Sequence, residues 1–192
     1  MNVKDMLRQA SDAAKQLITL SDQTIIGILK ETAQVLRTHT EEVLAANRQD
    51  LERMDPANPK YDRLKLTEER LQGIAADMEN VSTLPSPLNK VLSETIRPNG
   101  MVIRKVTVPF GVIGVIYEAR PNVTFDVFSL CFRSGNVCVL KGGSDADFSN
   151  RALVRIIHSV LERQGINPAV CTLLPPDREA TAELLGAVGL VD

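Results

Sequence analysis

The stretch GVIGVIYEARPNVTFDVFSLCFRSGNVCVLKGGSDA, residues 111–146, decides the fold class of this chain. It holds two apolar runs without a polar face, residues 112–117 and 137–140, and between them a helix-like segment from Pro121 to about Arg133. Strands that are apolar on both sides and alternate with helices are typical of a parallel sheet covered by helices on both faces. The stretch therefore predicts an α/β fold.

The same alternation continues toward the end of the chain. We expect a long helix over 145–164, a third strand over 169–174 and a third helix from Asp177 to about Leu185. The last residues, 186–192, resemble the opening of a fourth strand. Because a sheet that stops there would leave an exposed edge, we expect the chain to be the truncated front part of a larger protein.

The first part of the chain has a different pattern. Residues 1–84 carry apolar positions at helical spacing, with Ser21 and Thr67 as expected N-caps. A cluster with two prolines, residues 55–62, predicts a turn between these helices. We therefore expect a helical segment ahead of the sheet.

A β-hairpin is predicted between the helical segment and the sheet. Two β-rich runs, residues 91–96 and 101–108, flank Pro98-Asn99-Gly100, and Asn-Gly between such runs is a strong hairpin signal. A hairpin that stands alone is marginal in water. We therefore expect it to pack either on its own domain or on another subunit.

The composition is that of an ordinary globular protein. The 192 residues are 44% hydrophobic and 24% charged, with a net charge of −2, so there is no basic excess to attract nucleic acid or an anionic membrane. No run approaches the ~20 apolar residues of a membrane span, and the charged start lacks the core of a signal peptide. Three cysteines without a pairing pattern fit a reducing compartment. We expect a cytoplasmic protein.

Charged and polar residues follow the first apolar run. Ligands of open parallel sheets gather outside the carboxyl ends of the strands, where Glu118, Arg120 and Asn122 lie. The Arg120 guanidinium and the start of the next helix together suit a carboxylate or phosphate, and Asn122 could donate to an oxyanion. The alternative is a solvated turn in which Arg120 pairs with Glu118.

A second candidate segment follows the next strand. Lys141 ends this strand, Gly142 and Gly143 allow close approach of a ligand, and Ser144 can cap a helix or bind a sugar hydroxyl. The segment could hold the ribose and phosphate of a nucleotide. The alternative is a plain strand-to-helix turn with an exposed lysine.

No residue of the chain is a convincing catalytic nucleophile. Cys131, Cys138 and Cys171 all have apolar neighbours, which raise the pKa of a thiol and favour a structural role. His39 and His158 have no partner at the spacing of metal ligands, so we expect no metal site.

Residues 108–146, VPFGVIGVIYEARPNVTFDVFSLCFRSGNVCVLKGGSDA, resemble the gamma-glutamyl phosphate reductases, also called glutamate-5-semialdehyde dehydrogenases, a branch of the aldehyde dehydrogenase superfamily. AANRQDLERM at 45–54 and DRLKLTEERLQGIAADM at 62–78 support the resemblance, which spans essentially the whole chain. The wider superfamily usually has Pro-Trp-Asn at residues 118–120, and the departure from it points to the reductase branch.

The resemblance implies an activity and a set of site residues. The family reduces L-glutamyl 5-phosphate with NADPH to L-glutamate 5-semialdehyde and phosphate, the second step of proline synthesis from glutamate. The candidate substrate-binding residues are Glu118, Arg120 and Asn122. The candidate cofactor-binding residues, at the segment that holds the adenosine ribose, are Lys141, Gly142, Gly143 and Ser144.

The resemblance also implies a division of the chain. Residues 1–90 would be the N-terminal helical part of the cofactor-binding domain, 91–108 a bridging hairpin of a homo-oligomer, and 109–192 a Rossmann-like cofactor-binding portion that is incomplete. The catalytic cysteine is expected beyond Asp192, so we expect the chain alone to be inactive. The alternative function is that of an inactive fragment that at most binds nucleotide or a partner subunit.

Overall fold

Helices fill most of residues 1–84, as the sequence predicts, in a computed structural model that describes residues 1–192. They are α1 (Val3–Leu17), α2 (Asp22–Thr38), α3 (Thr40–Glu52), α4 (Tyr61–Leu64) and α5 (Glu68–Thr83). Both expected N-caps are confirmed, because Ser21 Oγ accepts from the N–H of Thr24 and Thr67 Oγ1 from that of Arg70, each at 3.1 Å. None of the helices combines the length and the apolar composition that crossing a membrane requires.

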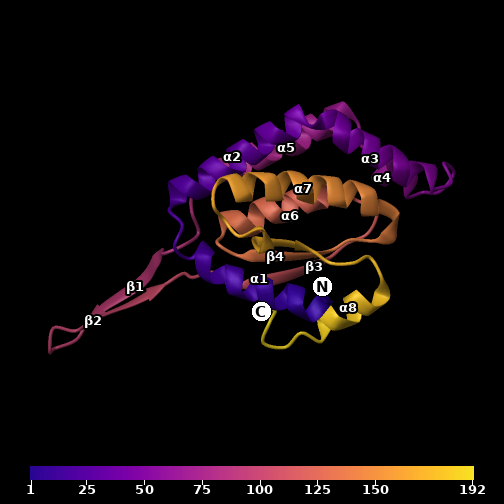
Figure 1. Cartoon of the computed structure of the whole chain (residues 1–192). Coiled ribbons are helices and arrows are strands. Elements are labelled where there is room, and N and C mark those ends of the chain that lie inside the picture. Colours follow the sequence, from indigo (N-terminus) through magenta and orange to yellow (C-terminus); the bar gives the residue numbers. More distant parts are fainter.

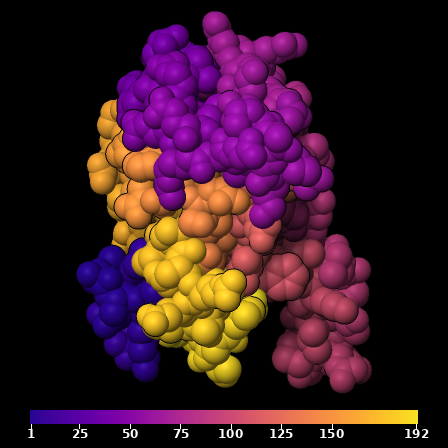
Figure 2. All heavy atoms as spheres, turned by 90° about the vertical axis from the view of Figure 1, so that its right-hand side faces the viewer, coloured from indigo at the N-terminus to yellow at the C-terminus, as the bar shows by residue number.

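The predicted hairpin is present and stands away from the rest of the chain. Its strands β1 (Val91–Ile96) and β2 (Val102–Val106) pair antiparallel, and every residue of both strands is exposed. Figure 1 shows the hairpin projecting from the body, and Figure 2 shows it apart from the C-terminal segment. Of the two expected supports, its own domain is therefore not the one that the hairpin packs on.

The sheet has three parallel strands, in the order β3-β4-β5. The strands are β3 (Val112–Ile116), β4 (Val137–Lys141) and β5 (Cys171–Leu173), and the helices that follow them are α6 (Asn122–Arg133), α7 (Asp147–Arg163) and α8 (Arg178–Leu185). The expected strand–helix alternation is thus confirmed. It brings the carboxyl ends of β3 and β4 to the same edge of the sheet.

Four layers surround one hydrophobic core of 39 buried residues. Helices α6 and α7 cover one face of the sheet and α1 and α8 the other, while α2, α3 and α5 form an outer layer on α6 and α7 (Figure 1). The central strand β4 is buried along its whole length, as expected. The edge strand β3 is not, since Gly114 and Ile116 are exposed.

Two expected strands differ in the structure. Residues 186–192 form no strand, because they fold back on themselves in an isolated bridge between Val188 and Val191, and only Asp192 hydrogen-bonds to β3. The third strand is shorter than expected. The Asn167 side chain accepts from the N–H of Ala169 and holds Pro168–Val170 in a 3-10 turn, so β5 begins at Cys171.

Candidate functional site

The two candidate segments lie side by side at the carboxyl end of the sheet. A Cβ atom at Gly143 would lie 3.5 Å from Cα of Glu118, so the two loops are in contact. Lys60 joins them from a third direction, since its Nζ donates to Glu118 Oε2 at 3.1 Å and lies 3.7 Å from Asp145 Oδ2. The structure thus brings the predicted substrate and cofactor segments to one place, where ligands of parallel sheets bind.

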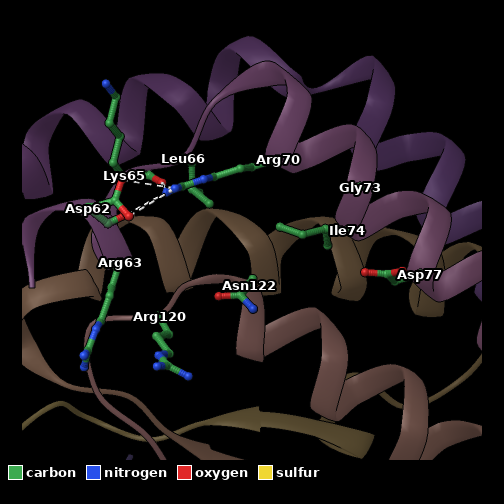
Figure 3. A pocket seen from close by; sticks show the side chains of 10 residues that line it. All are labelled: Asp62, Arg63, Lys65, Leu66, Arg70, Gly73, Ile74, Asp77, Arg120 and Asn122. Atoms are coloured by element: carbon green, nitrogen blue, oxygen red, sulfur yellow. Dashed lines mark hydrogen bonds and ion pairs between the residues drawn. The ribbon is translucent and has the colours of Figure 1, made fainter.

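A cavity of about 360 Å³ opens beside the first segment, under α5 (Figure 3). Its lining residues are Asp62, Arg63, Lys65, Leu66, Arg70, Gly73, Ile74, Asp77, Arg120 and Asn122. A smaller cavity of about 120 Å³ shares part of this wall, and its lining residues are Lys60, Arg63, Glu118, Ala119 and Arg120. Basic side chains outnumber acidic ones in both walls, which favours an anionic ligand.

Arg120 is available to a ligand. Its side chain is exposed and makes no hydrogen bond or ion pair within the chain, whereas Glu118 is paired with Lys60. The alternative of a turn closed by an Arg120–Glu118 pair is therefore not the one that the structure adopts. A guanidinium at the start of α6 adds its charge to the positive end of the helix dipole.

Asn122, the first residue of α6, faces the same cavity but is partly engaged. Its Nδ2 donates to Asp126 Oδ2 at 3.0 Å, which leaves one amide hydrogen for another acceptor. Burial is the main cause that raises the pKa of Asp126, the bond from Asn122 opposes it, and the charge of Asp77 adds to it. The role of Asn122 toward an oxyanion stays a prediction.

The second segment is held more tightly than a plain turn. Lys141 is buried, and its Nζ donates to the carbonyls of Gly142 (3.0 Å) and Pro176 (3.1 Å), so the alternative with an exposed lysine is wrong. A Cβ at Gly142 would lie only 2.3 Å from Asn150 Nδ2, so packing alone requires a glycine there. Ser144 is exposed, and its hydroxyl has no partner in the chain. The cofactor role of these residues stays a prediction.

A buried hydrogen-bond chain lies beneath the two segments, and sequence reasoning missed it. Thr124 Oγ1 donates to Asn150 Oδ1 at 3.1 Å, so Tyr117 donates its phenol proton to Thr124, at 2.7 Å. Burial raises the pKa of Tyr117 well above its usual value and keeps the phenol protonated. The chain therefore ties the end of β3 to α6 and α7 under the site.

A second buried network fixes the wall of the large cavity. Asn47 Oδ1 accepts from the N–H of Leu66 at 2.8 Å, and its Nδ2 donates to the Leu64 carbonyl (2.9 Å) and to Ser149 Oγ (3.0 Å). Ser149 in turn donates to Asp50. The signal in the sequence is that Val43, Asn47 and Asp50 share one helix face, where buried polar groups need fixed partners.

The three cysteines are buried free thiols. Burial raises the pKa of Cys131 to about 12, and a hydrogen bond with Cys171, followed by burial, raises the pKa of Cys138. His158 Nε2 lies 2.7 Å from the Cys171 carbonyl, and His39 is exposed at the junction of α2 and α3. A buried thiol that stays protonated is a poor nucleophile.

No family model matches the chain, but curated relatives of the chain are gamma-glutamyl phosphate reductases. The chain is 64% identical over 190 residues to the gamma-glutamyl phosphate reductase of Azobacteroides pseudotrichonymphae, covering 99% of this chain and 45% of that protein. The reductase of Bacteroides thetaiotaomicron is 61% identical over 191 residues, covering 100% of this chain and 46% of that protein. The chain thus spans about half the length of the curated relatives it matches.

Solved structures agree with these relatives. The gamma-glutamyl phosphate reductase of Thermotoga maritima matches with a TM-score of 0.92 and 31% identity, over 96% of this chain and 46% of that one. A Listeria monocytogenes protein described as a probable aldehyde dehydrogenase matches with a TM-score of 0.72 and 17% identity, over 95% of this chain and 38% of that one, which shows a common fold alone. Over essentially its whole length the chain is therefore similar to gamma-glutamyl phosphate reductases and corresponds to their N-terminal portion, and it shares its fold with aldehyde dehydrogenases.

Proposed function

We propose that the chain forms the cofactor-binding portion of a reductase that converts L-glutamyl 5-phosphate to L-glutamate 5-semialdehyde in the cytoplasm, as the second step of proline synthesis. The observation that carries the proposal is the 64% identity over 190 residues with a gamma-glutamyl phosphate reductase. The match covers 45% of that relative, so we extend the activity of the whole relative to this chain as a proposal.

The substrate side of the proposal rests on Arg120. The substrate carries a phosphate and a carboxylate, and Arg120 presents an unpaired guanidinium to a cavity with a mainly basic wall. Asn122 keeps one amide hydrogen for a reacting oxygen. Glu118 would act by holding Lys60 beside the bound anion.

NADPH is the cofactor that we propose for the second segment, and the residues present fit it. Gly142 lets the backbone pack on Asn150 beneath the segment, and Gly143 carries no side chain that would block an approaching ribose. Ser144 offers a free hydroxyl, and Lys141 keeps a third N–H beyond its two carbonyl acceptors. When bound, NADPH supplies the hydride of the reduction. The residues of this chain would bind and orient it.

The burial of the three cysteines is relevant to the alternative function, that of an inactive fragment. Its three thiols are buried, so none is placed to attack an acyl phosphate, and we propose that the 192 residues alone do not turn over. The exposed hairpin would join copies of the chain in a homo-oligomer. Binding of nucleotide or of a partner subunit would then remain the function of these residues.

NADPH titration of the purified chain, followed by the nicotinamide fluorescence, tests the cofactor site. We expect saturable binding that Ser144→Ala weakens by roughly threefold to tenfold, because one hydrogen bond to a sugar hydroxyl is lost. Ser93→Ala, on the distant hairpin, is the matched control and should bind normally. Absence of binding, or equal binding by Ser144→Ala, would contradict the proposed site.

Activity is measured on the same preparation. We expect no reduction of NADP⁺ when glutamate 5-semialdehyde and phosphate are added together. Turnover by the purified chain would show that one of its own groups acts as the nucleophile and would refute the proposed inactivity of these residues alone.

A further inference from the structure

Two exposed arginines line both cavities at the site, and we call Arg63 and Arg120 the arginine pair. They come from different elements, since Arg63 lies on α4 and Arg120 on the loop between β3 and α6. Figure 3 shows both side chains extending to the same side, away from α5. Neither guanidinium makes a hydrogen bond or an ion pair within the chain. Two forks of donors therefore border one small space.

The other cations around this space are already engaged or directed elsewhere. Arg70 donates to the carbonyls of Asp62 and Lys65, both at 2.6 Å, and to the Asp62 carboxylate at 3.1 Å. Lys60 is paired with Glu118. Lys65 directs its ammonium away from the arginine pair (Figure 3). In the wall of the smaller cavity, the arginine pair thus supplies all the positive charge that has no counter-ion.

The segment that carries Arg63 is fixed on both sides. The preceding residue, Asp62, accepts from Arg70 through both its carbonyl and its carboxylate. The following residue, Leu64, is fully buried, and its carbonyl accepts from Asn47 Nδ2 at 2.9 Å. Because the backbone of Arg63 is held before a ligand arrives, less freedom is lost on binding than at a mobile loop.

We propose that Arg63 is a second anion-binding residue, which acts with Arg120 to hold one oxyanion group of the substrate, a phosphate or a carboxylate. The inference rests on the proposed function, whose substrate carries both groups, and extends its site to α4. Two guanidinium forks bind the oxygens of such a group in two directions, as a single arginine cannot. The start of the 12-residue α6, beside Arg120, adds a favourable dipole.

Titration of the ¹⁵N-labelled chain with inorganic phosphate, at constant ionic strength, tests the pair. We expect the Nε–H signals of Arg63 and Arg120 to shift together and to saturate at one dissociation constant. Arg63→Ala and Arg120→Ala should each raise this constant about tenfold, as expected for a lost charge-assisted bond. Arg63→Lys, which keeps the charge and loses the fork, should raise it less.

Glutarate is titrated in parallel, because it offers the carboxylate without the phosphate. Tighter binding of phosphate assigns the pair to the phosphate of the substrate, and tighter binding of glutarate assigns it to the carboxylate. Arg97→Ala, on the turn of the hairpin, is the control, since this exposed arginine is equally unpaired and lies outside both cavities. Thermal unfolding followed by circular dichroism shows that each variant is folded.

The outcomes separate this inference from the proposed function. If Arg120→Ala weakens binding while Arg63→Ala and Arg63→Lys bind like the unchanged chain, the role of Arg63 is overturned and the substrate site around Arg120 stands. If neither anion binds, or Arg97→Ala weakens binding as much as the other two, both the pair and the proposed substrate site are overturned.

Discussion

Asp50 is a buried carboxylate of α3 that caps the start of a different helix, α7. Its oxygens accept from the N–H of Phe148 (3.1 Å) and of Ser149 (2.8 Å) and from Ser149 Oγ (2.6 Å), at the start of α7. The cap residue of α7 itself, Ala146, makes no side-chain bond, so α3 supplies the acceptors that a local N-cap would provide.

Replacement of Asp50 by asparagine should destabilise the chain by about 1–3 kcal/mol, because an NH₂ group would face backbone donors that then lose their acceptor. Urea unfolding followed by circular dichroism measures the change in the free energy of unfolding. Asp12→Asn, in an exposed pair with Lys15, is the control and should change it by less than about 0.5 kcal/mol. An equal, small effect of both substitutions would contradict the capping role.

Asp50 should make the free energy of unfolding depend on pH, because the pKa of its carboxyl group is raised in the folded chain. Burial is the main cause that raises its pKa in the folded chain, against its hydrogen bonds. A raised folded pKa means that the folded state binds the proton more tightly, so this contribution to stability falls as pH rises from the unfolded value of about 4 through the folded one. The stability difference between the unchanged chain and Asp50→Asn should therefore shrink over that range. A difference that grows with pH would contradict the direction of the shift.

The cysteines give a direct chemical prediction. Because all three thiols are buried and burial raises the pKa of Cys131 to about 12, a thiol reagent at pH 8 should label none of them in the folded chain and all three in urea. Mass spectrometry counts the labels. Rapid labelling of a folded chain would mean that a cysteine is accessible after all.

At the scale of elements, the hairpin is the part that contributes least to the stability of a single chain. Its residues are all exposed, and Ile96 pairs only with Val102 across the two strands. Ile96→Asp should therefore leave the free energy of unfolding of the body within about 0.5 kcal/mol, measured in urea. If the hairpin joins copies of the chain, the mass of the same variant in sedimentation should fall toward the 21.1 kDa of a single chain. A marked loss of stability without a change in sedimentation would mean that the hairpin packs on its own body.

The sequence predicts elements better than it predicts what they bring together. The apolar runs of β3 and β4 and the caps Ser21 and Thr67 are local signals, and the structure confirms them. The segment 186–192 has the composition of a strand, but two of its own residues, Val188 and Val191, pair with each other instead of with a neighbouring strand. Composition alone is therefore misleading there.

The site divides in the same way. Arg120 follows an apolar strand and Lys141 ends one, so the sequence predicts that both lie at the carboxyl edge of the sheet, where the structure has them. Lys60, Arg63 and Asp50 come from segments far ahead in the sequence, and no periodic pattern indicates which later loop they will face. Tertiary packing alone brings Lys60 and Arg63 to the site and Asp50 to the start of α7.

At the scale of the whole molecule, the first helix is a necessary cover of the sheet. Leu7 and Leu17 of α1 are each 1% exposed, and α1 packs on β4 and α8. Leu7→Ala should lower the free energy of unfolding by about 2–5 kcal/mol, although it lies close to the N-terminus. The neighbouring Ile18 is 69% exposed, so Ile18→Ala should have little effect in the same urea titration. Similar effects of both substitutions would mean that α1 does not close the core.

The contacts of α1 also set an order of events during synthesis. Gln16 Nε2 donates to the Gly165 carbonyl at 3.0 Å, its Oε1 accepts from the N–H of Asn167 at 2.8 Å, and Arg163 pairs with Glu31. The first helices thus find their partners about 130–150 residues later in the chain. When the ribosome has made only the helical segment, the apolar faces of these helices are exposed because the sheet region that they pack on has not been synthesised. Chaperones bind such exposed apolar faces. The nascent chain therefore completes its core only when α8, which carries the core residues Ala180 and Leu184, has left the exit tunnel.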